Sequence, residues 1–163
     1  MIISEVKTEQ LFIIQDLAYK IWPSTYGEIL SKIQLDYMLD KFYNLNYLQN
    51  QLENGQNFIL ISNENVIVGF ASYEFNFEKS NKTKIHKIYV LPEIQRKGVG
   101  KILMDFIKNK AVENTNLGLL LNVNRFNKAI TFYEKYGFTN VSLIDIEIGN
   151  GYLMQDYVME LNL

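Results

Sequence analysis

Hydrophobic residues recur every three or four positions through the first third of the chain, and this spacing predicts helices. After a short strand at residues 2–6, Thr8 is expected to cap a helix that the segment Trp22–Gly27 breaks. Ser31 starts a second helix, and residues 46–52 form a further short one. The N-terminal part of the chain is therefore expected to be mostly helical.

Past Gly55 the pattern changes to the spacing that is typical of strands. Residues 57–61 and 66–75 are predicted as two strands that an asparagine-rich turn joins. Residues 76–82 are polar and are expected to form a mobile loop. This hairpin and loop lead into the most informative stretch of the sequence.

That stretch is Lys84–Phe106, where a strand leads through a glycine turn into a helix. The strand ends at Val90, and Pro92 stops it because proline has no N–H to donate to a sheet. Gly98 and Gly100 open the helix, so several unpaired backbone N–H groups lie at its N-terminus, where the helix dipole favours an anion. Glycines also let a ligand approach the main chain closely. The stretch therefore predicts a pyrophosphate site.

The last part of the chain alternates strands and a helix. Residues 117–123 form an apolar run typical of a strand buried on both faces. Asn127 starts a helix, and strands are predicted at residues 141–148 and 156–161. The order β-αα-ββββ-α-β-α-ββ predicts an α/β fold of the mixed α+β kind, with a central mixed sheet and helices on both faces. We expect a single domain over residues 1–163.

Composition excludes several function classes. The net charge of −2 gives no basic surface for nucleic acid or an anionic membrane. Cysteine is absent, which excludes disulfides and thiol nucleophiles, and the one histidine argues against a conventional zinc site, so we expect no metal. No apolar run approaches the roughly 20 residues of a membrane span, and the start lacks a signal-peptide pattern. We therefore expect a cytoplasmic protein.

The glycine turn can be compared with three known classes. A P-loop needs a hydroxyl residue where Ile102 stands, and a dinucleotide fingerprint needs a third glycine where Leu103 stands. The segment Gln95–Gly100, which reads Gln-Arg-Lys-Gly-Val-Gly, resembles the Gln/Arg-x-x-Gly-x-Gly/Ala signature of the Gcn5-related N-acetyltransferase (GNAT) superfamily. The alternative is a turn that merely joins a strand to a helix.

Two further segments carry the resemblance. Residues 122–138 are similar to the family pattern Asn-x-x-Ala-x-x-Phe/Leu-Tyr-x-x-x-Gly-Phe, with Asn127 two residues before Ala129 where many members have three. Either Asn127 or Asn124 is therefore expected to contact the coenzyme. The segment Trp22–Tyr26, with Leu30, Ser31 and Leu35 after it, resembles bacterial polyamine and diamine acetyltransferases. The element order is also that of the GNAT fold, so the resemblance covers essentially the whole chain.

This resemblance implies that acetyl-coenzyme A is the donor and that a primary amine attacks it directly. It further implies that two parallel strands splay between Val90 and Val123 to admit the pantetheine arm, and that the main-chain N–H of Val90 polarises the thioester carbonyl. The expected coenzyme-binding residues are Tyr89, Val90, Gln95, Arg96, Lys97, Gly98, Val99, Gly100, Lys101, Asn127 and Lys135. Lys87 is a further candidate for a phosphate contact, the alternative being a solvated surface charge.

Tyr133 and His86 are the candidate catalytic residues. A tyrosine with its ordinary pKa near 10 can protonate a departing thiolate, whose pKa is roughly 8.5; the alternative for Tyr133 is a core residue. His86 alternates with Ile88 and Val90 along the strand and is a candidate base, or else a histidine packed in the sheet. Rival bases are three glutamates and a chain of waters; the glutamates are Glu28, Glu74 and Glu147.

The acceptor pocket is expected to contain Trp22, Tyr26 and Tyr73, whose aromatic faces can hold a cationic amine, unless they only fill the core. The leading hypothesis is acetylation of a small amine or polyamine. Acetylation of a protein N-terminus or lysine is an alternative, and a coenzyme A-binding sensor without activity is another. The resemblance also implies a homodimer, and the negative net charge argues against a nucleic-acid or membrane partner.

Overall fold

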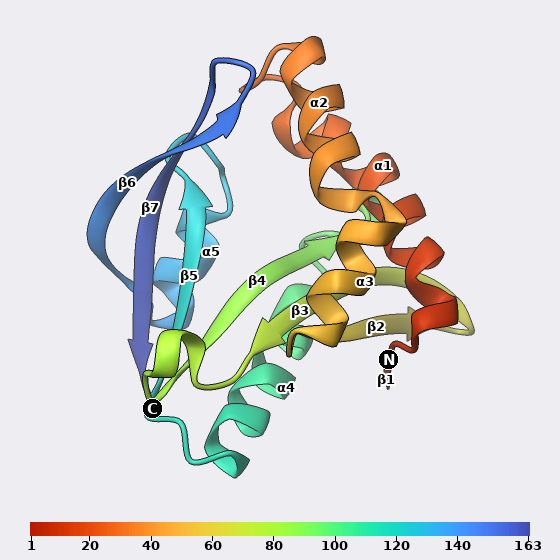
Figure 1. The fold of residues 1–163 in the computed structure, drawn as a ribbon. Helices are drawn as coiled ribbons and strands as arrows, with labels where there is room; N and C mark the ends of the chain where they lie inside the picture. The colour runs from red at the N-terminus through yellow and green to blue at the C-terminus, as the bar shows by residue number, and fades with distance from the viewer.

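The computed structural model describes all residues, 1–163, and contains one seven-stranded sheet in the order β1-β2-β3-β4-β5-β7-β6 (Figure 1). The strands are β1 (Ile2–Glu5), β2 (Asn57–Asn63), β3 (Val66–Glu74), β4 (Lys82–Val90), β5 (Gly118–Asn124), β6 (Thr139–Gly149) and β7 (Tyr152–Asn162). The helices are α1 (Leu11–Tyr26), α2 (Lys32–Tyr43), α3 (Leu45–Glu53), α4 (Val99–Glu113) and α5 (Ile130–Tyr136). None of the helices combines the length and the apolar character that crossing a bilayer requires.

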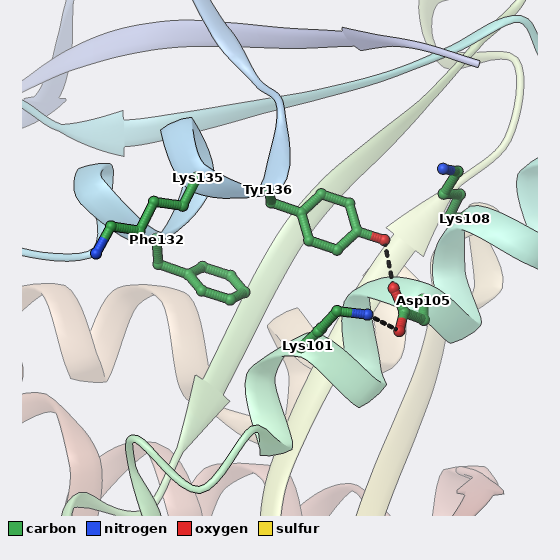
Figure 2. Close-up of a pocket in the computed structure, with 6 residues that line it drawn as sticks. All are labelled: Lys101, Asp105, Lys108, Phe132, Lys135 and Tyr136. Atoms are coloured by element: carbon green, nitrogen blue, oxygen red, sulfur yellow. Dashed lines mark hydrogen bonds and ion pairs between the residues drawn. The ribbon is translucent and has the colours of Figure 1, made fainter.

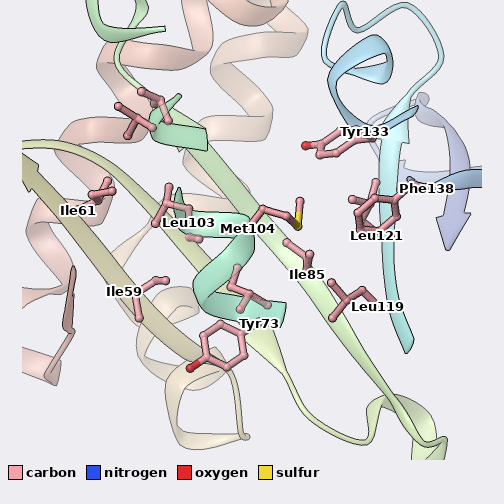
Figure 3. Close-up of a cluster of buried hydrophobic side chains, with 14 of the residues drawn as sticks. Ile59, Ile61, Tyr73, Ile85, Leu103, Met104, Leu119, Leu121, Tyr133 and Phe138 are labelled. Carbon is pink, nitrogen blue, oxygen red and sulfur yellow. The ribbon is translucent and has the colours of Figure 1, made fainter. Parts of the chain in front are cut away.

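The sheet is mixed and has helices on both faces, as predicted. Only β4 and β5 pair in parallel, and every other neighbouring pair is antiparallel. Helices α1, α2 and α3 pack on one face through a cluster that includes Ile14, Leu39 and Phe70. Helices α4 and α5 pack on the other face through a second cluster that includes Leu103 and Phe138 (Figure 3). The sheet therefore separates two hydrophobic cores.

The N-terminal helices differ from the prediction at two points. The segment Trp22–Gly27 does not break the helix, because α1 continues through Pro23 to Tyr26. Pro23 costs one backbone hydrogen bond, but the burial of Ile21 and Trp22 holds this turn in the core. Thr8 does not act as a cap, since it begins a 3-10 turn with Lys7 in the cap position. Ser31 does cap α2, where its Oγ accepts from the Gln34 N–H at 3.1 Å.

The strand count also needs one correction. Three strands, β2 to β4, lie between α3 and α4, where the expected order had four. The predicted loop at residues 76–82 contains a 3-10 turn and ends in the first residue of β4. The last helix starts at Ile130 rather than Asn127, because the Asn127 Oδ1 accepts from the Ala129 N–H at 2.8 Å and forms a separate turn before it. Asn150 and Gly151 join β6 to β7.

The parallel pair β4 and β5 determines where a ligand can enter the sheet. Their pairing extends only from Lys82 opposite Gly118 to Ile85 opposite Leu121. Beyond this point the strands separate, and Figure 1 shows them close at one end and apart at the other. The expected splay between these strands is therefore present in the fold.

A second irregularity lies on the other side of β4. Ser72 of β3 is opposite Lys87, but the next residue, Tyr73, is opposite Ile85, so His86 has no partner in the ladder. Such a bulge interrupts the alternation of side chains. Ile85, and not His86, consequently shares a core cluster with Val90. The prediction that His86 lies on the same face as Ile88 and Val90 is wrong for this reason.

Close backbone packing between β3 and β4 leads to a prediction at Gly69. A Cβ at Gly69 would lie 2.6 Å from the Tyr89 carbonyl oxygen and 3.3 Å from the Val90 Cα, and neither backbone atom can move without shifting the strand. We expect Gly69→Ala to lower the free energy of unfolding by about 2 kcal/mol or more in urea denaturation. Gly100→Ala is the control, because a Cβ there would meet only the Phe132 ring at 3.6 Å. Equal denaturation midpoints for the two variants would contradict the prediction.

Candidate active site

A cleft of about 1240 Å³ lies where β4 and β5 diverge. Helices α1, α2 and α3 contribute one wall, and the segment before α4 and the start of α5 contribute the other. The cleft brings together twelve of the predicted site residues: Trp22, Tyr26, His86, Tyr89, Val90, Gln95, Arg96, Gly98, Gly100, Lys101, Asn127 and Tyr133. Lys97, Val99, Lys135 and Tyr73 do not line it.

The segment between β4 and α4 forms a cradle of free N–H groups. No backbone N–H from Arg96 to Lys101 donates a hydrogen bond within the protein, and the first helical bond after them runs from the Ile102 N–H to the Gly98 carbonyl. Arg96 and Gly98 adopt left-handed conformations with φ of 65° and 80°. Successive N–H groups in such a turn converge on an anion. Above Gly98 the space is open, since a Cβ there would have no neighbour within 4 Å. This cradle fits a pyrophosphate.

The side chains around the cradle have varied roles. The Gln95 Nε2 donates to the Val90 carbonyl oxygen at 3.1 Å, so Gln95 fixes the end of β4. Lys101 forms an ion pair with Asp105 at 2.6 Å. Val99 is buried in the core between α4 and the sheet, so only its main-chain N–H is available to a ligand. The anion site is therefore built mainly from backbone.

The end of β4 presents further N–H groups to the gap. The Leu91 N–H donates to the Val68 carbonyl, toward β3. Because hydrogen-bonding groups alternate in direction along a strand, the N–H groups of Val90 and Ile88 point away from β3. On that side β5 has already diverged, so neither group has a strand partner. Val90 therefore offers the free donor that was predicted for it.

Tyr133 comes from α5 and reaches the same gap. Its ring packs against Phe132 and Phe138, and in Figure 3 the hydroxyl points away from Phe138. The hydroxyl makes no hydrogen bond to the protein, although the residue is buried and lines the cleft. Burial, and then the neighbouring Tyr26, raise the pKa of Tyr133 well above its ordinary value. The phenol is consequently protonated at neutral pH and able to donate.

Aromatic rings form the wall opposite Tyr133. The Tyr26 and Tyr89 hydroxyl groups are 2.9 Å apart, and the Trp22 ring lies 4.7 Å from the Tyr26 ring. The indole Nε1 of Trp22 is buried and has no partner. Tyr73 is not part of this wall. It lies in the core on the α4 side of the sheet (Figure 3), because its position on β3 directs it to that face.

His86 lines the cleft but is already engaged. Its Nε2 lies 2.8 Å from a Glu74 carboxylate oxygen, and its ring packs edge-on against Phe77. Burial, and then the ammonium groups of Lys87 and Lys84, hold the pKa of His86 well below its ordinary value. The neutral ring donates from Nε2 to Glu74 at neutral pH. As a base, His86 is much weaker than an ordinary histidine.

The remaining rival bases are placed as follows. Glu28 lines the cleft at its solvent edge, where its side chain is 88% exposed and 3.6 Å from the Lys128 ammonium group. Glu74 is paired with His86. Glu147 lies on β6 and does not line the cleft.

Comparisons with known proteins identify this arrangement. The model of the acetyltransferase (GNAT) domain family matches residues 28–161. The chain belongs to the GNAT acetyltransferase family. The fold is also that of the PaiA N-acetyltransferase from Thermoplasma acidophilum in complex with coenzyme A, with 24% identity, all of both chains covered and a TM-score of 0.81.

Two other solved structures show the same fold. A GCN5-related N-acetyltransferase from Rhodopseudomonas palustris matches with 19% identity, 99% of this chain and 95% of that one covered, and a TM-score of 0.84. The ribosomal-protein-alanine N-acetyltransferase from Brucella melitensis matches with 19% identity, full coverage of both chains and a TM-score of 0.68. The protein is thus an acetyl-coenzyme A-dependent N-acetyltransferase.

Sequence reasoning missed two buried lysines on β4 of the GNAT domain, of which Lys87 lines the cleft and Lys84 does not. Lys87, expected at a phosphate or in solvent, is buried instead, with its Nζ 2.8 Å from the Gln51 Oε1 and over the Tyr43 and Phe58 rings. Burial lowers the pKa of Lys87 to about 7. Lys84 donates to the Asn122 side chain, and burial lowers the pKa of Lys84 to about 8. The only available sequence signal was a run of lysines within a predicted central strand.

Asp156 is the other missed residue. It lies on β7 opposite Asn124 of β5, is only 7% exposed and lines the cleft. Burial raises the pKa of Asp156 to about 6, against the opposing effect of Lys84 and Arg125. The sequence signal was an acidic residue in an otherwise apolar strand.

The two asparagines considered for the coenzyme contact are both placed in the cleft. Both line the cleft, and each uses its Oδ1 to accept a nearby backbone N–H: Asn124 from Phe126 at 2.9 Å, and Asn127 from Ala129 at 2.8 Å. The Asn127 side chain also lies close enough to the Tyr26 hydroxyl to oppose the raised pKa of Tyr26, and both asparagines stay candidates.

A shallower groove of about 410 Å³ lies beside the cradle, between α4 and α5 (Figure 2). Lys135, which does not reach the cleft, lines this groove together with Lys101 and Lys108. The Asp105 carboxylate joins the two sides of the groove: it accepts a hydrogen bond from Lys101 at 2.6 Å and one from the Tyr136 hydroxyl at 2.7 Å (Figure 2). The groove is therefore predominantly cationic.

The cradle leads to a prediction at Gly98. Ala at this position places a Cβ in the open space of the anion site, so we expect Gly98→Ala to weaken coenzyme A binding about tenfold or more in calorimetry. Gly55→Ala is the matched control, because Gly55 also has a positive φ, of 101°, and no neighbour within 4 Å of a Cβ. Both variants should lose about 1 kcal/mol of stability from backbone strain. Unchanged affinity in Gly98→Ala would contradict the cradle.

Asp156 leads to a prediction about stability and pH. Its folded pKa of about 6 lies above the ordinary 3.8, so the folded state binds the proton more tightly. The wild type should therefore lose stability relative to Asp156→Asn as pH rises from about 4 to 6, and the difference should stay constant above that. At pH 7 we expect Asp156→Asn to be the more stable, by an amount on the order of 2 kcal/mol in urea denaturation. A pH-independent difference would contradict the raised pKa.

Proposed function

We propose that this enzyme acetylates a primary amine of a small molecule, with a polyamine as the leading acceptor class. The observation that carries this proposal is the aromatic wall of Trp22, Tyr26 and Tyr89, which faces the gap between β4 and β5. The faces of aromatic rings attract an alkylammonium group, and they offer no comparable attraction to an anionic acceptor. The resemblance of the segment Trp22–Tyr26 to polyamine acetyltransferases points the same way.

In this proposal the two halves of the cleft hold different substrates. The N–H groups from Arg96 to Lys101 bind the pyrophosphate of the coenzyme. The groove that Lys135 lines binds a phosphate group at the nucleotide end of the coenzyme. Bound acetyl-coenzyme A supplies an activated acetyl thioester. The free N–H of Val90 lies where the strands separate, and a single such donor to a developing oxyanion is worth about 3 kcal/mol.

Tyr133 acts as the general acid in the proposed mechanism. Its hydroxyl is protonated, has no protein partner and reaches the gap from the face opposite the acceptor wall. It can therefore deliver a proton to the leaving sulfur. A coenzyme-binding sensor would not require this arrangement, and that supports an active enzyme.

The function is tested by incubating the protein with acetyl-coenzyme A and separate amines, and measuring release of free thiol. The panel contains spermidine, 1,4-diaminobutane, free amino acids and a peptide with an N-terminal alanine. We expect turnover with the polyamines. Turnover of the peptide alone would favour a protein acetyltransferase, and coenzyme binding without any turnover would favour the sensor.

Tyr133→Phe provides the second readout. It removes the proton donor but keeps the ring that packs against Phe138, so coenzyme affinity should change less than about twofold. Because general acid catalysis is worth about 10²–10⁴ in rate, kcat should fall at least about 100-fold. Steady-state kinetics with the best amine of the panel measures this effect. An unchanged kcat would remove Tyr133 from the mechanism.

A further inference from the structure

The acceptor side of the cleft contains one buried carboxylate. Asp156 on β7 is opposite Asn124 on β5, and opposed residues of antiparallel strands share a face. The same face carries Asn122, whose side chain contacts Lys84 from the diverging strand β4. Asp156 therefore lies on the side of the sheet that α1 and its aromatic residues cover, across the gap from α5 and Tyr133.

Asp156 has no partner in the protein. Its carboxylate forms neither an ion pair nor a side-chain hydrogen bond, although the residue is 7% exposed. Burying an unpaired carboxylate is costly, and a cation bound in the cleft would offset that cost. Only one other acidic residue, Glu28, lines the cleft, and its side chain extends into solvent. The cleft thus offers a single sequestered anionic group to a cationic acceptor.

The charges that face Asp156 are already engaged elsewhere. Lys84 on β4 donates to Asn122, and Arg125 after β5 forms an ion pair with Asp145 of β6. On the helical side Asp156 faces Tyr26 of α1, whose pKa is raised by burial and then by the charge of Asp156. The two cations lower the pKa of Asp156, but burial raises it further, to about 6. At neutral pH the carboxylate is ionised and still a stronger base than an ordinary aspartate.

We propose that Asp156 binds the ammonium group of the acceptor and accepts its proton, acting as the general base of the transfer. The proposal rests on the proposed acetylation of an amine. An alkyl amine with a pKa near 10.4 is almost wholly protonated at pH 7, so a base must take its proton before nitrogen can attack. His86, the expected base, is held by Glu74 and has a lowered pKa, so it is the weaker candidate.

The protons balance in this scheme. The ammonium nitrogen loses one proton to the Asp156 carboxylate, which later releases it to solvent. The neutral nitrogen forms a bond to the acetyl carbon, and the carbon–sulfur bond breaks. The nitrogen then loses a second proton, and one proton reaches the sulfur through the Tyr133 hydroxyl. The products are the N-acetylated amine and the free thiol of the coenzyme.

The test compares Asp156→Asn with the wild type, using spermidine as the probe amine. We expect kcat at pH 7 to fall at least about 100-fold, as for loss of a general base. In the wild type kcat/KM, which reports the pKa values of the free enzyme, should decline below about pH 6, and this acidic limb should be absent from the residual activity of Asp156→Asn. Calorimetry in the presence of coenzyme A should show spermidine affinity reduced about tenfold or more.

Glu160→Gln is the matched control. Glu160 lies four residues further along β7, pairs with Lys82 at 2.8 Å and does not line the cleft, so the same loss of charge should leave kcat and spermidine affinity unchanged. Asp156→Glu keeps the charge and should retain the acidic limb. Urea denaturation of Asp156→Asn at pH 7, where we expect the variant to be at least as stable as the wild type, distinguishes a loss of activity from a loss of fold.

The outcomes separate this inference from the proposed function. If the wild type turns over an amine while Asp156→Asn keeps its kcat, or loses kcat but keeps the acidic limb, the assignment of Asp156 is overturned and the function stands. If the wild type turns over no amine, the proposed function fails and calorimetry decides the ammonium site. Binding of spermidine to the wild type but not to Asp156→Asn then supports an ammonium site at Asp156. Equal spermidine affinity of the two proteins, or no binding to either, overturns that site.

Discussion

The divergence of two parallel strands is the constraint on which the rest of this structure depends. β4 and β5 pair over four residues on each strand and then separate inside the sheet. In a continuous sheet the N–H groups of Ile88 and Val90 would be satisfied by a neighbouring strand. Here they face open space, and so do six consecutive N–H groups before and within the first turn of α4. The fold thus leaves a line of donors for one extended, anionic ligand.

Both hydrophobic cores support this separation. Side chains of α4 and α5 fill the space under one face, and those of α1 to α3 fill the other. Close backbone contact at Gly69 keeps β3 and β4 paired as far as Val90, beyond the point at Ile85 where β5 leaves. The N–H groups can remain unpaired because packing elsewhere supplies the stability that they do not. Rigid elements on both sides of the gap also fix where a substrate and Tyr133 can meet.

Burial changes the chemistry of the charged groups around this gap. Lys87 and Lys84 have lowered pKa values, and Asp156 has a raised one, because each is removed from water without a full ion pair. His86 loses basicity for the same reason. A histidine was the natural candidate for a base near neutral pH, but desolvation moves its pKa away from neutrality and moves that of an aspartate toward it. The identity of the base thus depends on burial, which residue type alone does not reveal.

The sequence by itself determined the features that rest on local chemistry. Helical spacing, the cap at Ser31 and the glycine turn after Pro92 are properties of neighbouring residues, and the anion cradle follows from them. It also identified Tyr133, Trp22 and Tyr26, which the fold brings to one cleft. Only the tertiary structure decided which face each strand residue occupies, because the bulge at His86 and the register of β7 depend on contacts between distant segments. For that reason the sequence did not reveal that Tyr73 lies in the core, or that Lys87 and Asp156 are buried charges in the cleft.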